Sequence, residues 1–124
     1  MGAGIPRFAS FVNCLSQDVV DDAYCCTIVD CDLGNGQHRN ATNDPAVFTK
    51  TSFHHPDELV EEFAVGGLKV QHLLAVEGPG KLIPSFEKCW ENPEQREWLL
   101  DMVRKVEGEV HLFGTSAHLM VVAT

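Results

Sequence analysis

Apolar side chains recur every three or four residues in four stretches of the chain, which is the spacing of one face of an α-helix. The first two stretches predict helices over residues 6–15 and 18–33. A third helix is expected between His55 and Gly66, and a fourth from about Asn92, both with proline in the first turn. The side chains expected on the buried faces are Phe8, Phe11, Val12, Leu15, Val20, Tyr24, Ile28, Leu59, Val60, Phe63, Ala64, Trp98, Leu99, Met102, Val103 and Val106.

Two further stretches are nearly continuous in apolar and β-branched residues, as in buried strands. They cover residues 68–76 and 117–123, and residues 47–53 form a shorter extended segment. This order of helices and strands is typical of an α/β fold with helices packed on a sheet. Because the pattern starts the chain directly in a helix and supplies only two clear strands, we expect further strands upstream.

A long polar segment separates the second helix from the extended segment. Residues 34–45 are mostly turn-forming residues and carry one imidazole, one guanidinium and several amides. Loops of this length in compact domains are often lids or binding segments. The cluster Gln37, His38, Arg39 and Asn40 is therefore the first candidate site, and the alternative is a solvated turn.

Size and charge exclude several classes of protein. The chain has 124 residues, 44% of them hydrophobic, as in one globular domain. Nine basic and eighteen acidic side chains give a net charge of -9, which disfavours nucleic acid and anionic lipid as partners. No apolar run is long enough to span a membrane and no signal peptide is evident, so we expect a cytoplasmic protein.

The cysteines form neither a disulfide framework nor a zinc ribbon. They are Cys14, Cys25, Cys26, Cys31 and Cys89. We interpret them as reduced thiols and expect no metal site; the alternative is a small metal-binding protein in which Cys25 or Cys26 joins Cys31 and His38 as ligands. Motifs of serine hydrolases, zinc proteases and nucleotide hydrolases are absent, and Gly2 and Gly4 have no preceding strand to make a phosphate loop.

Four segments together resemble the C-terminal half of small Rossmann-like S-adenosylmethionine-dependent methyltransferases. They are, in this order, residues 5–10 (IPRFAS), 36–40 (GQHRN), 53–59 (FHHPDEL) and 74–80 (LAVEGPG). The tryptophan-bearing helix followed by residues 116–119 (SAHL) is similar to the antiparallel strand pair that closes the sheet of that fold. The resemblance covers nearly the whole chain, with departures at Pro6, Ala41 and Lys81.

The resemblance implies a partial Rossmann-like sheet with flanking helices and a helical lid. Residues 16–45 would be the helix and lid loop, residues 46–124 the helix-strand-helix-strand closing unit, and residues 1–4 the end of the fifth strand. The family binds its methyl donor with the first half of the fold, through a glycine-rich loop and an acidic residue. S-adenosylmethionine would therefore be the cofactor of the complete domain, and this chain alone is expected to bind none and to be inactive.

The resemblance also implies that the chain receives a small-molecule methyl acceptor. Arg7 and Arg39 would hold an anionic or carbonyl group, and His38 or His55 would accept a proton; structural hydrogen bonds or helix capping are the alternatives. The expected acceptor-binding set is Arg7, Phe8, Gln37, His38, Arg39, Asn40, Phe53 and His55. The alternative function is a non-catalytic module that docks through an exposed sheet edge, either on a second copy or on a separate N-terminal half.

Overall fold

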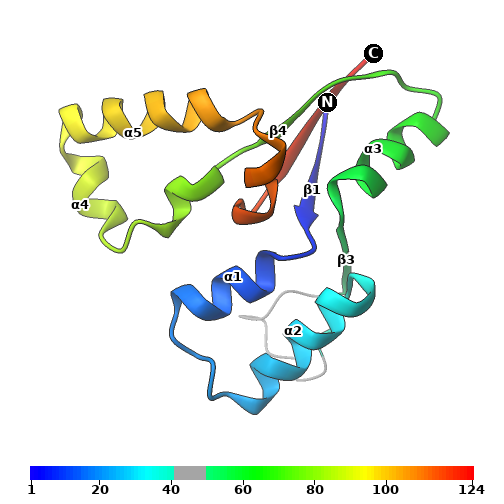
Figure 1. Cartoon of the computed structure of the whole chain (residues 1–124), viewed down its shortest axis with the longest axis horizontal. Coiled ribbons are helices and arrows are strands. Elements are labelled where there is room, and N and C mark those ends of the chain that lie inside the picture. The colour runs from blue at the N-terminus through cyan, green and yellow to red at the C-terminus, as the bar shows by residue number, and fades with distance from the viewer. Residues whose placement is uncertain (41–49) are drawn as a thin grey trace.

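The strands form one mixed sheet in the computed structural model, which describes residues 1–40 and 50–124 (Figure 1). In chain order they are β1 (Gly2–Pro6), β2 (Gln37–His38), β3 (Thr51–His54), β4 (Val70–Ala75) and β5 (Leu119–Ala123). Across the sheet their order is β2-β3-β1-β5-β4. β1 is parallel to β3 and antiparallel to β5, which is in turn antiparallel to β4. The chain is therefore an α/β protein, as the sequence pattern predicts.

The helices surround this sheet in three groups (Figure 1). They are α1 (Ala9–Ser16), α2 (Ala23–Asn35), α3 (Pro56–Val65), α4 (Phe86–Glu91) and α5 (Pro93–Val106), with the 3-10 helices η1 (Gly78–Leu82) and η2 (Val110–Thr115). α1 and α2 pack on each other beyond the carboxyl end of β1, and α3 packs against β3, β4 and β5. α5 packs on α4 and η1.

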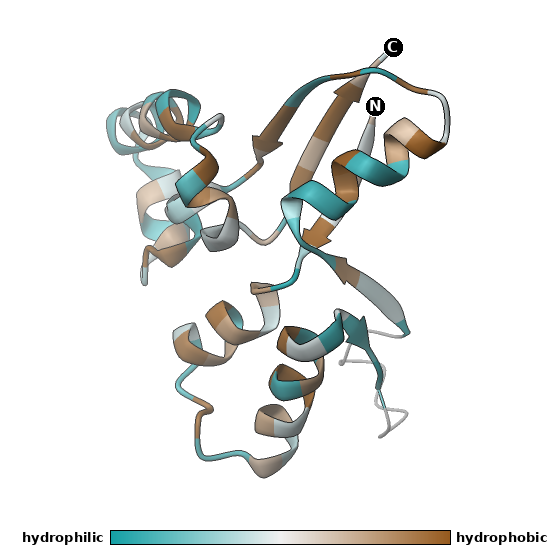
Figure 2. Cartoon of the chain, turned by 45° about the vertical axis from the view of Figure 1, so that its right-hand side comes forward, coloured by the Kyte–Doolittle hydropathy of each residue, from teal (hydrophilic) through white to brown (hydrophobic). Residues whose placement is uncertain are grey.

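The core lies between α3 and the sheet. Its buried members are Leu59, Ala75, Phe113, Leu119 and Val121. Leu119 and Val121 of β5 have no exposed surface, and Figure 2 shows the hydrophobic residues of β4 and β5 next to each other. Burying side chains of this kind is the main contribution to stability in a domain of this size.

The expectation from the hydrophobic pattern that the chain starts directly in a helix is wrong, because residues 2–6 form β1, an inner strand of the sheet; the strand end that the resemblance implies over residues 1–4 agrees with β1. This strand is missed by hydrophobic pattern because its side chains are so small. A Cβ on Gly4 would lie 2.9 Å from Leu59 Cδ2, and one on Gly2 would collide with Phe63. The two glycines therefore allow α3 to pack directly on β1, and they have no role as a phosphate loop.

The predicted strands agree with the structure where it describes them. β4 and β5 lie inside the predicted stretches 68–76 and 117–123, and they pair antiparallel as expected. β3 is the end of the predicted extended segment 47–53, whose first three residues lie outside the described residues. Residues 41–45 of the predicted lid also lie outside them.

Of two helices that begin with a capping side chain, one starts where the sequence predicts and the other does not. α5 begins at Pro93 as predicted, since Asn92 Oδ1 accepts from the backbone N–H groups of Glu94 and Gln95 at 3.1 and 3.2 Å. α2 begins later than the predicted Asp18, because Asp22 is its N-cap and accepts from Cys25 N at 2.8 Å.

Several side chains expected in buried faces are exposed instead: Phe8, Phe11, Leu15, Val20, Ala64 and Trp98.

None of the helices in the described residues is both long and apolar enough to cross a lipid bilayer.

Candidate functional site

A cavity of about 450 Å³ lies where β1 and β3 end, between the sheet and the α1–α2 pair. Ligands in open α/β sheets bind at the carboxyl ends of the strands, and this volume is in the range of small-molecule sites. Ile5, Ala9, Ile28, Val29 and Phe53 give it apolar walls. Polar groups on its lining include Tyr24, His38, Lys81 and His118. We call this space the main cavity for its place at the carboxyl ends of β1 and β3; two other clefts are larger, at about 490 and 570 Å³.

His38 is anchored to the main cavity by a buried carboxylate. Its Nδ1 lies 2.9 Å from Oδ2 of Asp32, and the two residues are 6% and 0% exposed. The ring of His38 also stacks on Phe53, with centroids 4.8 Å apart and planes inclined by 9°. A carboxylate in this position favours the tautomer with hydrogen on Nδ1.

The local backbone explains how Asp32 and His38 meet. Asp32 lies in the last turn of α2, and Gly36 ends the helix in the left-handed region at a φ of 70°. The chain then reverses into β2, where Gly36 O accepts from Phe53 N at 2.6 Å and His38 pairs with Thr51. The turn at Gly36 thus brings the side chain of His38 into contact with that of Asp32.

The second nitrogen of His38 is buried and has no hydrogen-bond partner among the described residues. Within residues 1–40 and 50–124, neither Nε2 of His38 nor Oδ1 of Asp32 has a hydrogen-bond partner, although both atoms are buried. A buried polar atom without a partner costs free energy, so such atoms are informative about function. With hydrogen on Nδ1, Nε2 carries the lone pair and can accept a proton from a hydroxyl or amine.

A second carboxylate–imidazole pair lies on the β5 side of the main cavity. His118 Nδ1 is 2.5 Å from Oε1 of Glu77, while Oε2 of Glu77 accepts from Ser116 Oγ at 2.9 Å and from His118 N at 3.0 Å. Burial raises the pKa of Glu77, but the hydrogen bonds from His118 and Ser116 outweigh it and lower the pKa overall. Glu77 therefore stays ionised and fixes the orientation of His118.

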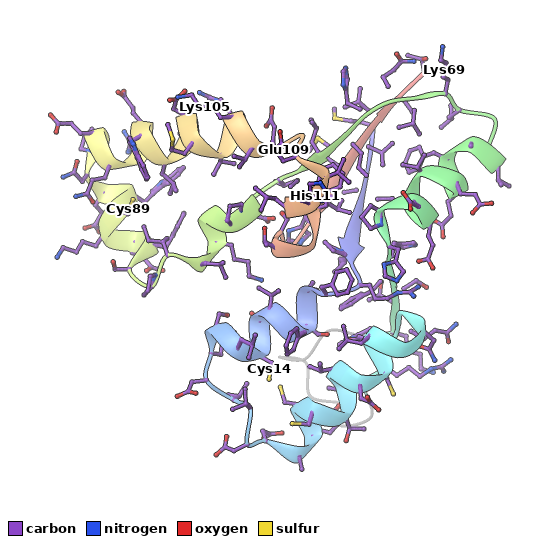
Figure 3. All side chains as sticks on the ribbon, in the orientation of Figure 1. Cys14, Lys69, Cys89, Lys105, Glu109 and His111 are labelled. Carbon is purple, nitrogen blue, oxygen red and sulfur yellow. The ribbon has the colours of Figure 1, made fainter. Side chains whose placement is uncertain are left out.

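The thiol of Cys25 also lines the main cavity. Cys14, on α1, points toward α2, where Cys25 lies (Figure 3). Burial, together with a hydrogen bond to Cys14, raises the pKa of Cys25 above its ordinary value. This thiol is therefore protonated at neutral pH and contributes a weakly polar wall.

Of the predicted acceptor-binding residues, only His38 and Phe53 line the main cavity. Tyr24 OH, on its wall, donates to Oδ1 of Asn40 at 3.3 Å, so Asn40 lies beside it. Gln37 and Arg39 are exposed and bond to each other, from Arg39 Nη2 to Gln37 Oε1 at 2.5 Å.

Arg7, Phe8 and His55 lie elsewhere. Arg7 lines a separate cleft of about 490 Å³, and its Nη2 donates to both carboxylate oxygens of Glu58 at 2.7 Å. A backbone hydrogen bond from His55, more than the charge of Arg7, lowers the pKa of Glu58. His55 is the N-cap of α3, and its ring meets Phe8 edge-on with centroids 5.5 Å apart. Arg7 therefore makes a structural hydrogen bond, and His55 caps a helix, which are the alternatives given for these residues.

Sequence reasoning missed Asp32, although the helical spacing contains a signal for it. Tyr24, Ile28 and Asp32 are four residues apart, so Asp32 continues the apolar stripe on which the first two lie. A carboxylate on such a stripe is buried and needs a partner. Lys81 and His118 were also missed as lining residues, since they approach the cavity from distant parts of the chain and no local spacing relates them to it.

The described residues do not form a metal centre: no group of three or more His, Cys, Asp or Glu side chains among them is arranged to hold an ion. His38 is bonded to Asp32, and Cys26 and Cys31 are exposed. Among the described residues, Cys25, Cys26, Cys31 and His38 are therefore not gathered into one group of possible ligands.

The turn after β4 does not have the geometry that would hold a nucleoside donor such as S-adenosylmethionine. A nucleoside donor needs a strand that runs into a glycine-rich turn whose amides face the ligand. β4 is followed by Gly78 and Gly80, but the N–H groups of Glu77 and Gly78 both donate to Ser116 Oγ at 3.1 Å. A Cβ on Gly80 would lie 2.9 Å from Val103 Cγ2, so this turn is packed against α5.

Comparisons of this chain with models of known protein families, with curated proteins and with solved structures find no match.

Proposed function

We propose that this chain is the acceptor-binding portion of an S-adenosylmethionine-dependent methyltransferase, and that the main cavity receives the methyl acceptor. In this proposal the donor is held by polypeptide other than the described residues, and the chain is inactive without it. The four resembling segments support the proposal, as does the antiparallel strand β5 between β1 and β4. The five cysteines are free thiols, which favours the cytosol as the compartment.

The observation that carries the proposal is the pair of Asp32 and His38 on the wall of the main cavity. A carboxylate that holds one imidazole nitrogen while the other is unpartnered is the arrangement of an oriented general base. A purely structural histidine at this burial would be expected to use both of its nitrogens.

His38 would act on a hydroxyl group of the acceptor. Its Nε2 takes the hydroxyl proton, and Asp32 stabilises the imidazolium that results. S-adenosylmethionine, held by other polypeptide, would supply an electrophilic methyl group to the complete enzyme. The apolar walls, including Ile28 and Phe53, would align the acceptor, which is the main requirement of a methyl transfer.

A test uses 4-nitrophenol, whose hydroxyl ionises near neutral pH with a visible change in absorbance. Beside Nε2 of His38, bound 4-nitrophenol should give up its proton at a pH where the free molecule keeps it. We expect His38→Gln to abolish this increase in phenolate absorbance and Asp32→Asn to reduce it about tenfold. His72→Gln, at an exposed position of β4, is the matched control and should behave as the unchanged chain.

Two results would count against the proposal. One is an absorbance change that His38→Gln leaves intact, because the base would then be another group. The other is micromolar binding of S-adenosylmethionine to this chain in a calorimetric titration, which would contradict the placement of the donor on other polypeptide.

The second candidate function is the non-catalytic docking module, and the sheet itself favours it. β4 is an edge strand in the described part of the chain, so its outer backbone groups face away from the sheet; of these, Ala75 N already donates to Glu107 O at 2.8 Å. Leu74, Met120 and Val122 lie on the sheet face opposite α3 and are partly exposed. Sedimentation tests this candidate, because a second copy docked on this surface gives a dimer, whereas a monomer at all concentrations counts against it.

A further inference from the structure

The lining of the main cavity has a charge opposite to that of the chain. The chain carries eighteen acidic and nine basic side chains. The described residues that line the main cavity nevertheless include Lys81 and two histidines, and no Asp or Glu. The carboxylates of Asp32 and Glu77 each bond the Nδ1 of an imidazole, that of His38 and that of His118.

Lys81 is the positive charge that these contacts leave without a partner. It lies in the last turn of η1, is partly buried, and lines both the main cavity and a neighbouring cleft of about 570 Å³. In the part of the chain that the structure describes, no carboxylate oxygen lies within ion-pair distance of its ammonium group. An ammonium group on a cavity wall is strongly attractive to an anion, because the surrounding protein screens it less than water does.

The main cavity has two polar regions, one at His38 and one at His118, and these are far apart. His38 is on β2, and His118 immediately precedes β5. In the order β2-β3-β1-β5, these strands are three spacings apart, or roughly 14 Å across the sheet. The apolar side chains of Ile5 and Phe53, which are paired in register on β1 and β3, lie between them. One molecule that reaches both regions must be elongated, with an apolar middle.

We propose that the acceptor is an elongated hydroxylated carboxylate: its hydroxyl meets His38, its apolar body lies against Ile5 and Phe53, and its carboxylate binds the ammonium of Lys81. This inference rests on the proposed function, since it names the substrate class of the same cavity. His118, oriented by Glu77, borders the carboxylate end and donates to the anion when it is protonated.

The test compares 4-hydroxycinnamate with its methyl ester, which has the same shape and no charge. By calorimetry at low salt, we expect the acid to bind about tenfold more tightly than the ester, as for one charge-assisted hydrogen bond. Lys81→Gln should remove this preference and leave the binding of the ester unchanged, and Lys81→Arg should restore it. Lys88→Gln, at an exposed position of α4, is the matched control. Added salt should weaken the acid alone.

The outcomes separate the two proposals. Equal binding of acid and ester, or a preference that survives Lys81→Gln, overturns the carboxylate inference while the proton transfer from 4-nitrophenol to His38 still stands. If neither compound binds and 4-nitrophenol shows no deprotonation that depends on His38, the main cavity is not a site for a hydroxylated acceptor, and both proposals fail.

Discussion

Oδ2 of Asp32 lies 2.9 Å from Nδ1 of His38, and this contact joins the last turn of α2 to the edge strand β2. Both side chains are buried, so each group depends on the other to offset the cost of leaving water. Because the same contact leaves Nε2 of His38 unpartnered among the described residues, one interaction both stabilises the fold and prepares the proposed base.

Removing the imidazole should destabilise the chain strongly. We expect His38→Ala to lower the free energy of unfolding by about 3 kcal/mol, because it leaves the carboxylate of Asp32 buried without a partner. Asp32→Asn keeps an oxygen acceptor for Nδ1 and should cost about 1 kcal/mol. Urea denaturation of both variants measures the difference. Equal costs for the two would mean that the pairing of charge and imidazole is not what stabilises this turn.

The parts of the fold that the sequence predicts are those with local causes. The start of α5 is predicted by Asn92, its N-cap, and by Pro93, its first residue. The strand 119–123 is predicted by an uninterrupted run of apolar residues. β1 could not be predicted in this way. Its glycines are explained only by Phe63 and Leu59, which come from a helix about sixty residues away in the chain.

The candidate site was predictable in part for the same reason. His38 is a candidate from the sequence because it lies in a polar turn, but its partner Asp32 is identified only when the turn at Gly36 brings the two together. Arg7 and His55 were expected to contact the acceptor, yet Glu58 engages both of them, Arg7 through its carboxylate and His55 through the capping hydrogen bond at 2.8 Å. The residue type alone does not tell whether such a side chain bonds an acceptor or another part of the protein, because both partners satisfy the same donors and acceptors.

The close contact of α3 with β1 predicts an asymmetry between two glycines. Gly4→Ala should cost about 1–3 kcal/mol, because its Cβ would lie 2.9 Å from Leu59 Cδ2 in a packed core. Gly34→Ala is the matched control: it lies in α2, has no atom within 4 Å of the added Cβ, and should stabilise by about 0.5–1 kcal/mol. Thermal or urea unfolding of both variants decides the point, and a neutral Gly4→Ala would contradict the packing of α3 described above.

The hydrogen bonds of Glu77 predict a pH-dependent contribution to stability. The pKa of Glu77 in the folded chain is lower than its ordinary value of 4.5, so ionised Glu77 favours folding above that value. The contribution is lost as the pH falls through the folded pKa. We therefore expect Glu77→Gln to melt below the unchanged chain at pH 7, and the gap to close in acid.

Thermal melts across the acid range check the effect of Glu77. Glu97→Gln is the control, because Glu97 is an exposed residue of α5. Its melting temperature should follow the unchanged chain at every pH. A constant gap between Glu77→Gln and the unchanged chain down to pH 2 would mean that the lost stability comes from packing and not from ionisation.

The raised pKa of Cys25 predicts the order in which the thiols react. Only the thiolate is nucleophilic, so burial and the hydrogen bond to Cys14 should make Cys25 react slowly with iodoacetamide near neutral pH. Cys26 and Cys31 are exposed and should be alkylated first. Mass spectrometry of digested samples taken over time gives the three rates. Since Cys25 lines the main cavity, bound 4-hydroxycinnamate should slow its alkylation further and leave the other two unchanged, whereas equal protection of all three thiols would place the ligand elsewhere.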